Sequence, residues 1–189
     1  MKDLKHLIYF ESLLENANNE LVQKAQAEGN LALGYTCYHV PEALLNVGNC
    51  FSVRLRAPHT GSIDIATYYM SNYTCEFARA LVERGIEGGY QFLDAMIGVD
   101  ACSMMNRAME HFEILKVNDK PNFFVTHCDI PYKITDYTLD SYVKQMRLRV
   151  LDRLAEVFGV DTSDAAIRAA VAEHNEVCSI ISEMGEMRK

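Results

Sequence analysis

The sequence predicts an α/β fold with a mostly parallel sheet, helices over its faces and a pair of helices at the C-terminal side. Three observations lead to this prediction. Short, nearly uncharged apolar runs are typical of strands that are buried on both faces. These runs alternate with amphipathic stretches of helical period, which implies right-handed crossovers between parallel strands. The 189 residues contain no internal repeat, low-complexity tract or linker, so we expect a single domain.

Helices and strands are expected to alternate in the first 60 residues. Apolar positions recur at helical spacing over residues 3–27 but are interrupted by a polar stretch, which predicts one long helix or two short ones. Residues 31–36 form an uncharged run that predicts a buried strand. Pro41 marks the first turn of a helix, where proline needs no N–H. Residues 51–56 predict the second strand.

The rest of the chain continues this alternation. In chain order, we predict a weak strand at 63–70, a helix capped by residues 72–74 and ending near 85, a strand at 92–99, a Met-rich helix at 104–112, a strand at 123–126, a long amphipathic helix over 139–157 and a last helix over 163–184. The long helix is predicted from apolar residues that recur at alternating steps of four and three positions.

Composition excludes several classes of protein. The chain has 18 Lys and Arg against 26 Asp and Glu, a formal net charge of −8, which argues against a basic nucleic-acid interface. Apolar residues make up 49%, which argues against disorder. No apolar run reaches the roughly 20 residues of a membrane-spanning helix, and the first thirty residues carry four glutamates, unlike a signal or transit peptide. We therefore expect a soluble, cytoplasmic protein without membrane or nucleic-acid partners.

Four of the six cysteines are expected at one edge of the sheet. Cys37, Cys102 and Cys128 each follow a predicted strand, and Cys75 follows the weaker one. In parallel sheets the carboxyl ends of the strands form the ligand-binding edge. Cys75 and Cys102 also fall in the first turns of predicted helices, where the helix N-terminus favours a thiolate over a thiol.

The alternative is that the cysteines are packed in the core, because free cysteine is among the most buried residue types. We expect this packing for Cys50, which precedes a strand, and for Cys178 on the apolar stripe of the last helix. No CxxC pair occurs, so a zinc ribbon is unsupported, and the absence of an export signal argues against a disulfide framework.

Two carboxylates lie near the same predicted strand ends. Glu42 and Asp100 are suited to proton transfer in a dry pocket, although most such groups are helix caps or surface charges. The sequence contains no GxGxxG or GxxxxGKS loop after a strand, so we do not expect ATP to bind to this chain.

Three segments resemble one protein family in the correct order. Residues 34–44, GYTCYHVPEAL, resemble the family motif G-x-x-C-x-x-x-P-E-x-x, and residues 71–79, SNYTCEFAR, resemble a second block with a cysteine at a helix start. Residues 93–102, LDAMIGVDAC, resemble a third block with a strand followed by a cysteine. The family is that of the 2-hydroxyacyl-CoA dehydratases and benzoyl-CoA reductases, D-component subunits, and the resemblance runs over residues 31–175.

The resemblance implies Rossmann-like domains that hold a [4Fe–4S] cluster through three cysteines per subunit, with one iron open to substrate. By the match, Cys75 and Cys102 are two of the ligands, and Cys37 lies at the cluster or at the acyl-CoA pocket. The third ligand of the family comes from a later domain. We therefore expect these residues to be the N-terminal domain of a longer subunit, or a shortened relative, and to hold little or no cluster and no activity alone.

The resemblance also implies a reaction. In a (R)-2-hydroxyacyl-CoA dehydratase, a separate ATP-dependent activator iron–sulfur protein supplies one electron, and a ketyl radical anion of the substrate expels hydroxide. Glu42 is our candidate for handling protons. The partner is a second homologous subunit or a second copy of the chain. The alternatives are a reductase of the same family with a double-cubane cluster, and a non-catalytic α/β binding or assembly domain whose cysteines are packed.

Overall fold

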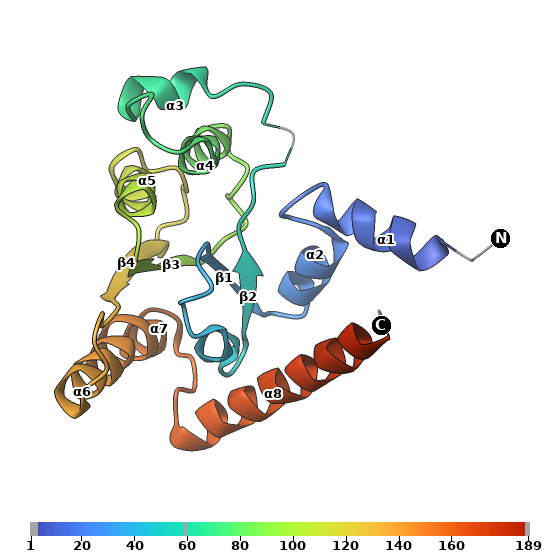
Figure 1. Cartoon of the computed structure of the whole chain (residues 1–189), viewed down its shortest axis with the longest axis vertical. Coiled ribbons are helices and arrows are strands. Elements are labelled where there is room, and N and C mark those ends of the chain that lie inside the picture. The colour runs from blue at the N-terminus through green and yellow to red at the C-terminus, as the bar shows by residue number, and fades with distance from the viewer. Residues whose placement is uncertain (1–3, 59, 188–189) are drawn as a thin grey trace.

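A parallel sheet of four strands forms the centre of the computed structural model, which describes residues 4–58 and 60–187 (Figure 1). The strands are β1 (Leu31–Tyr35), β2 (Cys50–Arg54), β3 (Ala95–Asp100) and β4 (Phe124–Asp129), in the spatial order β2-β1-β3-β4. All neighbouring pairs are parallel. The predicted α/β class with a parallel sheet is therefore confirmed.

The strand order places a switch point between β1 and β3. These two strands are paired in register, with Leu33 opposite Ala95 and Tyr35 opposite Ile97. The chain leaves β1 toward one face of the sheet and leaves β3 toward the other, so a crevice opens between their carboxyl ends. Such crevices are where open α/β sheets bind ligands.

One face of the sheet is covered by α2 (Glu20–Ala27), α4 (Glu76–Ile86) and α5 (Ser103–Ile114). Their apolar sides and the side chains of Ala32 and Met96 form a closed core. The short helix α3 (Asp64–Tyr69) packs on α4 and lies farther from the sheet (Figure 1). Helices α4 and α5 pack against each other and both begin at the carboxyl edge of the sheet.

The opposite face is covered by the 3-10 helix η1 (Glu42–Asn46) and by one continuous helical run. This run consists of α6 (Asp136–Gln145), the π-helical segment η2 (Met146–Leu151) and α7 (Asp152–Phe158). It follows the apolar stripe predicted over 139–157, and Val150 and Leu154 on it are fully packed against the sheet.

The two ends of the chain carry helices that extend away from the sheet. The helical pattern predicted over residues 3–27, of which residue 3 lies outside the described residues, corresponds to two short helices, α1 (Lys5–Leu14) and α2, and not to one long helix. The last helix, α8 (Asp164–Glu186), begins after the N-cap Ser163, which accepts a hydrogen bond from the backbone N–H of Ala166. Figure 1 shows α8 running past β2 toward the side where α1 lies.

Three sequence predictions were wrong in detail. The weak strand at 63–70 is the helix α3, whose Ala66 N–H donates to the carboxylate of Glu83 on α4 at 2.6 Å. Cys128 lies within β4 and not after it, because the strand extends beyond Thr126. Cys178 is exposed and not buried, because no other described element covers that part of α8.

Among the described residues, none of the helices is both long and apolar enough to cross a membrane.

Candidate functional site

The carboxyl edge of the sheet holds three of the cysteines that the sequence singled out. Cys37 follows β1, Cys102 follows β3 by two residues, and Cys75 precedes α4, which begins at this edge. The first two flank the switch point between β1 and β3. The fourth, Cys128, is fully buried in β4, and burial raises the pKa of its thiol.

Cys75 is the N-cap residue of α4. Its extended ψ of 144° ends the preceding turn, and its Sγ accepts a hydrogen bond from the N–H of Ala78 at 3.4 Å. The side chain of Cys75 thus gives a partner to one of the backbone N–H groups that the first turn of a helix leaves without an intrahelical acceptor. The thiol is exposed, so it is available to a ligand.

Cys102 is the N-cap residue of α5. Its backbone is extended, with φ −148° and ψ 113°, and its carbonyl accepts the first helical hydrogen bond, from Asn106 at 2.9 Å. Its sulfur makes no capping hydrogen bond and is exposed. The thiol is therefore free to bind a ligand beside the helix N-terminus.

Cys75 and Cys102 begin two helices, α4 and α5, that pack against each other. The helices pack side by side on the same face, as seen nearly end-on in Figure 1, and both start at the carboxyl edge. Each of the two cysteines thus lies at the N-terminus of a helix, of 11 residues for α4 and 12 for α5, where the helix carries a partial positive charge. Such a site suits thiolates bound to a soft metal or to an iron–sulfur cluster.

Two thiols are fewer than a cluster requires. Within residues 4–58 and 60–187, no three His, Cys, Asp or Glu side chains lie close enough together to hold a metal ion. Cys75 and Cys102 have the donor chemistry of iron–sulfur ligands, but a [4Fe–4S] cluster needs at least one further donor from elsewhere.

A cavity of about 290 Å³ lies at the same edge, beside β3 and β4. Asp100 and Ala101 line it from the end of β3, Tyr132 from the loop after β4, and His39 from the loop after β1. Asp100 also accepts a hydrogen bond from Asn106 in the first turn of α5. The cavity therefore adjoins the helix that Cys102 begins.

Cys37 lies on the other side of the crevice. It is half-buried against the core that faces η1 and α7, and its carbonyl accepts a hydrogen bond from Val40. Leu33 and Tyr35 of β1 belong to this core, whereas α4 and α5 cover the opposite face. Cys37 thus belongs to the same edge as Cys75 and Cys102 but to the other layer.

Glu42 is bound into a hydrogen-bond network beneath η1. Its carboxylate accepts from the hydroxyl of Ser52 at 2.9 Å, and Asn46 bonds both the hydroxyl and the backbone of Ser52. Burial, then the charge and hydrogen bond of Glu42, raise the pKa of Tyr35 to about 12. These contacts fix η1 to β2 on the sheet face away from α4 and α5.

Arg79 is a supporting residue that the sequence alone did not single out. Its guanidinium is buried, with 8% of the residue exposed, and its Nε donates to the carbonyl of Thr74 at 3.1 Å. Its Nη1 reaches Asn72 at 3.5 Å. Arg79 thus fixes the turn immediately before Cys75. The sequence offered one indication of this role, because Arg79 stands four residues after Cys75, among the apolar positions of the helix.

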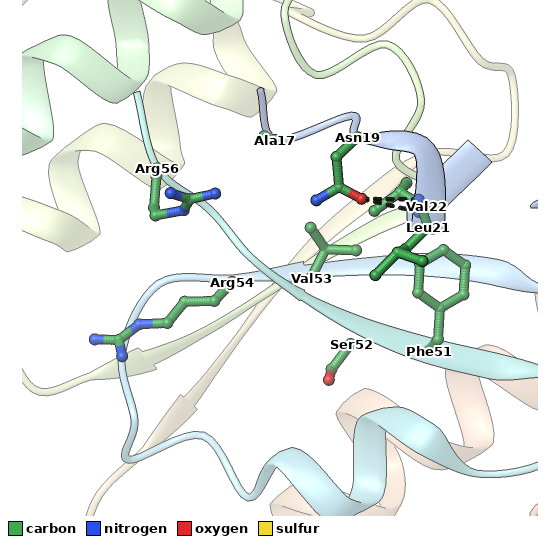
Figure 2. A pocket seen from close by; sticks show the side chains of 9 residues that line it. All are labelled: Ala17, Asn19, Leu21, Val22, Phe51, Ser52, Val53, Arg54 and Arg56. Carbon is green, nitrogen blue, oxygen red and sulfur yellow. Dashed lines mark hydrogen bonds between the residues drawn. The ribbon is translucent and has the colours of Figure 1, made fainter. Parts of the chain in front are cut away.

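A second cavity, of about 360 Å³, lies between the start of α2 and β2 (Figure 2). Two of its polar side chains, Asn19 and Arg56, already have partners. Asn19 accepts from the N–H groups of Leu21 and Val22, and Arg56 donates to the carbonyl of Leu14. Figure 2 shows the side chain of Arg54 extending away from Asn19. This cavity flanks the edge strand β2, which is separated from β3 by β1.

Comparison with protein families finds one match that covers most of the chain. Residues 37–189 match the family described as 2-hydroxyglutaryl-CoA dehydratase, D-component.

Three curated relatives are similar at low identity. The chain is 22% identical over 172 residues to the beta subunit of (R)-2-hydroxyglutaryl-CoA dehydratase from Acidaminococcus fermentans. The aligned residues make up 86% of this chain and 44% of that relative. It is 18% identical to the (R)-phenyllactyl-CoA dehydratase beta subunit of Clostridium sporogenes, and the alignment covers 92% of this chain and 45% of that relative. It is also 18% identical to a subunit of benzoyl-CoA reductase from Thauera aromatica, and that alignment covers 82% of this chain and 40% of the relative. The chain therefore spans less than half the length of these relatives.

Proposed function

Because this chain belongs to the 2-hydroxyglutaryl-CoA dehydratase D-component family, we propose that it is the cluster-binding part of a 2-hydroxyacyl-CoA dehydratase, a lyase. One observation carries the proposal. Cys75 and Cys102 are exposed N-cap residues of two helices that lie side by side and begin at the ligand-binding edge of a parallel sheet.

The two cysteines would hold two of the irons of a [4Fe–4S] cluster. Thiolates carry negative charge, and the two helix N-termini offset it. A third ligand would come from a further domain or from another subunit, because the described residues supply no third donor at this place. When bound, the cluster would supply the one-electron chemistry, after reduction by a separate ATP-dependent activator iron–sulfur protein.

The acyl-CoA substrate would enter at the switch point. The cavity beside Asp100 and Tyr132 adjoins the start of α5, so an acyl group bound there would lie near the helix that Cys102 begins. Apolar walls from Ile130 and Pro131 would exclude water from the acyl chain. Cys37 would border the same pocket from the layer below.

Glu42 is the proposed proton carrier. Its carboxylate has a hydroxyl partner in Ser52 and a tyrosine neighbour, Tyr35, at the end of β1, so a proton could pass along these groups toward the sheet edge. Glu42→Gln keeps the shape of the network and removes the basic group. We expect this variant to fold normally, to retain iron and to lose turnover; unchanged turnover would assign Glu42 a purely structural role.

The partner would be a second homologous protein chain. Two of the relatives are named beta subunits, and the third is likewise named as one subunit of its enzyme. This partner, or a further domain, would supply the remaining donor to the cluster.

The test is the dehydration of 2-hydroxyacyl-CoA thioesters by protein isolated without oxygen from its own cells, with its bound partners and the reduced activator. We expect activity in the wild type and its loss in Cys75→Ser and Cys102→Ser, whereas Cys178→Ser, a matched exposed thiol on α8, remains active. Equal activity in all four proteins would refute the proposal.

The iron content of the same samples separates the two alternatives. About four irons per site indicate a single cubane, and about eight indicate the double-cubane reductase of the same family. A folded, partner-bound protein without iron would identify a binding or assembly domain.

A further inference from the structure

The last helix carries an apolar stripe that no other described part of the chain covers. Of its 23 residues only Ala170 is buried, where the first turns pack against Val47 and Leu151. Farther along, the same side presents large apolar groups to solvent, and Val177 and Ile181 are 48% and 58% exposed. Figure 1 shows this half of α8 extending beyond the sheet.

A histidine and a cysteine lie at the centre of this stripe. His174 and Cys178 are one helical turn apart, and the Nε2 and Sγ atoms are 3.5 Å from each other. Residues four apart project from the same side of a helix, so both side chains face outward together. They lie on α8, apart from the cysteines at the sheet edge.

The distance between the two donor atoms fits a tetrahedral metal ion. A Zn–S bond of about 2.3 Å and a Zn–N bond of about 2.0–2.1 Å at the tetrahedral angle place sulfur and nitrogen about 3.5–3.6 Å apart. The observed separation matches this value without any change of rotamer. The two atoms are joined by a hydrogen bond in this structure, and their separation is also that of two ligands of one zinc ion.

We propose that α8 forms a zinc site between two copies of this chain, in which each copy contributes His174 and Cys178. Structural zinc takes four protein ligands, and a twofold axis duplicates a pair of ligands into four. The part of the chain that the structure describes offers no third donor beside the pair, so a single copy leaves the site incomplete.

The surroundings of the pair suit a second copy of α8. Val171, Val177, Ile181 and Met184 flank it and would be removed from water when two stripes meet.

Charge and protons balance on binding. Each Cys178 thiol loses its proton to solvent when the S–Zn bond forms, and each neutral His174 donates the lone pair of Nε2. Two thiolates then neutralise one Zn²⁺, and no redox step is involved.

The test uses the 189-residue chain, reduced with a phosphine and free of chelators. Zinc is titrated in competition with a chromophoric indicator, and the mass in solution is measured by sedimentation. We expect about one zinc per two chains and a dimer that reverts to monomer when a chelator is added. Cobalt in place of zinc should give the intense visible bands of a tetrahedral thiolate site.

The variants separate this site from the sheet edge. His174→Gln and Cys178→Ser should both abolish the zinc-dependent dimer while keeping the helical circular dichroism of the wild type. The double variant with Cys75→Ser and Cys102→Ser is the control and should still dimerise with zinc. A zinc-dependent dimer that persists in Cys178→Ser, or a dimer that is lost in the control, would overturn the proposal.

Discussion

The buried guanidinium of Arg79 offers a test of how the fold positions the candidate site. We predict that Arg79→Met destabilises the protein and loosens the turn before Cys75. Methionine keeps most of the packing of the arginine stem but cannot donate to the carbonyl of Thr74, which is then left without that partner.

The magnitude follows from the contacts. A hydrogen bond from a charged donor contributes about 1.5–3 kcal/mol, and the 3.5 Å contact to Asn72 adds little. We therefore expect a loss of about 2 kcal/mol in the free energy of unfolding, which corresponds to about 4–8 °C in Tm for a chain of this size.

The matched control is Arg84→Met on the same helix. Arg84 pairs only with the partly exposed Glu87 at 3.4 Å, and such surface pairs contribute about 0.2–1 kcal/mol. Thermal unfolding by circular dichroism gives the Tm of both variants, and maleimide labelling followed by peptide mass analysis gives the reactivity of Cys75. Equal Tm shifts in the two variants, or an unchanged labelling rate of Cys75 in Arg79→Met, would refute the reasoning.

Three further predictions concern stability and the sheet edge. Burial, followed by the charge of Asp94, raises the pKa of Cys50 from 9.0 to about 12. As the pH rises, the thiol of the unfolded chain ionises before that of the folded protein, so the free energy of unfolding should fall between about pH 9 and 12. The fall should be smaller in Cys50→Ala. Asp94→Ala removes an ion pair with Lys120 at 2.8 Å and a hydrogen bond to a β1 backbone N–H, so urea unfolding should show a loss of about 2–3 kcal/mol; a loss below about 0.5 kcal/mol would contradict this. Dibromobimane, which fluoresces after bridging two thiols, should link Cys75 to Cys102; fluorescence that persists when both are serine would show that other thiols react.

The fold was largely predictable because its strands are distinct in the sequence. The uncharged run at 31–36 became β1, and the segment at 51–56 became most of β2. The segment 63–70 was misread because Ile and Tyr favour strands locally, whereas the helix depends on Glu83 of α4, whose carboxylate accepts from Ala66. A contact between residues 17 positions apart leaves no local pattern.

The sequence located the two helix starts but not their surroundings. Cys102 follows β3 and is the N-cap residue of α5, as its place after a predicted strand indicated, whereas Cys75 is the N-cap residue of α4 although the helix α3 stands where a strand was predicted. An apolar stripe, by contrast, predicts a helix face but not what covers it, which is why Cys178 was expected in the core and lies exposed. The network that fixes Glu42 to Ser52 likewise joins separate elements.

The central claim is that Cys75 and Cys102 bind one iron–sulfur cluster together, and low-temperature electron paramagnetic resonance tests it most directly. The sample is the protein isolated without oxygen from its own cells, reduced by one electron. We predict a cubane signal in the wild type and in Cys178→Ser, and its loss in Cys75→Ser and in Cys102→Ser alike. A signal of undiminished intensity in either sheet-edge variant would contradict the account.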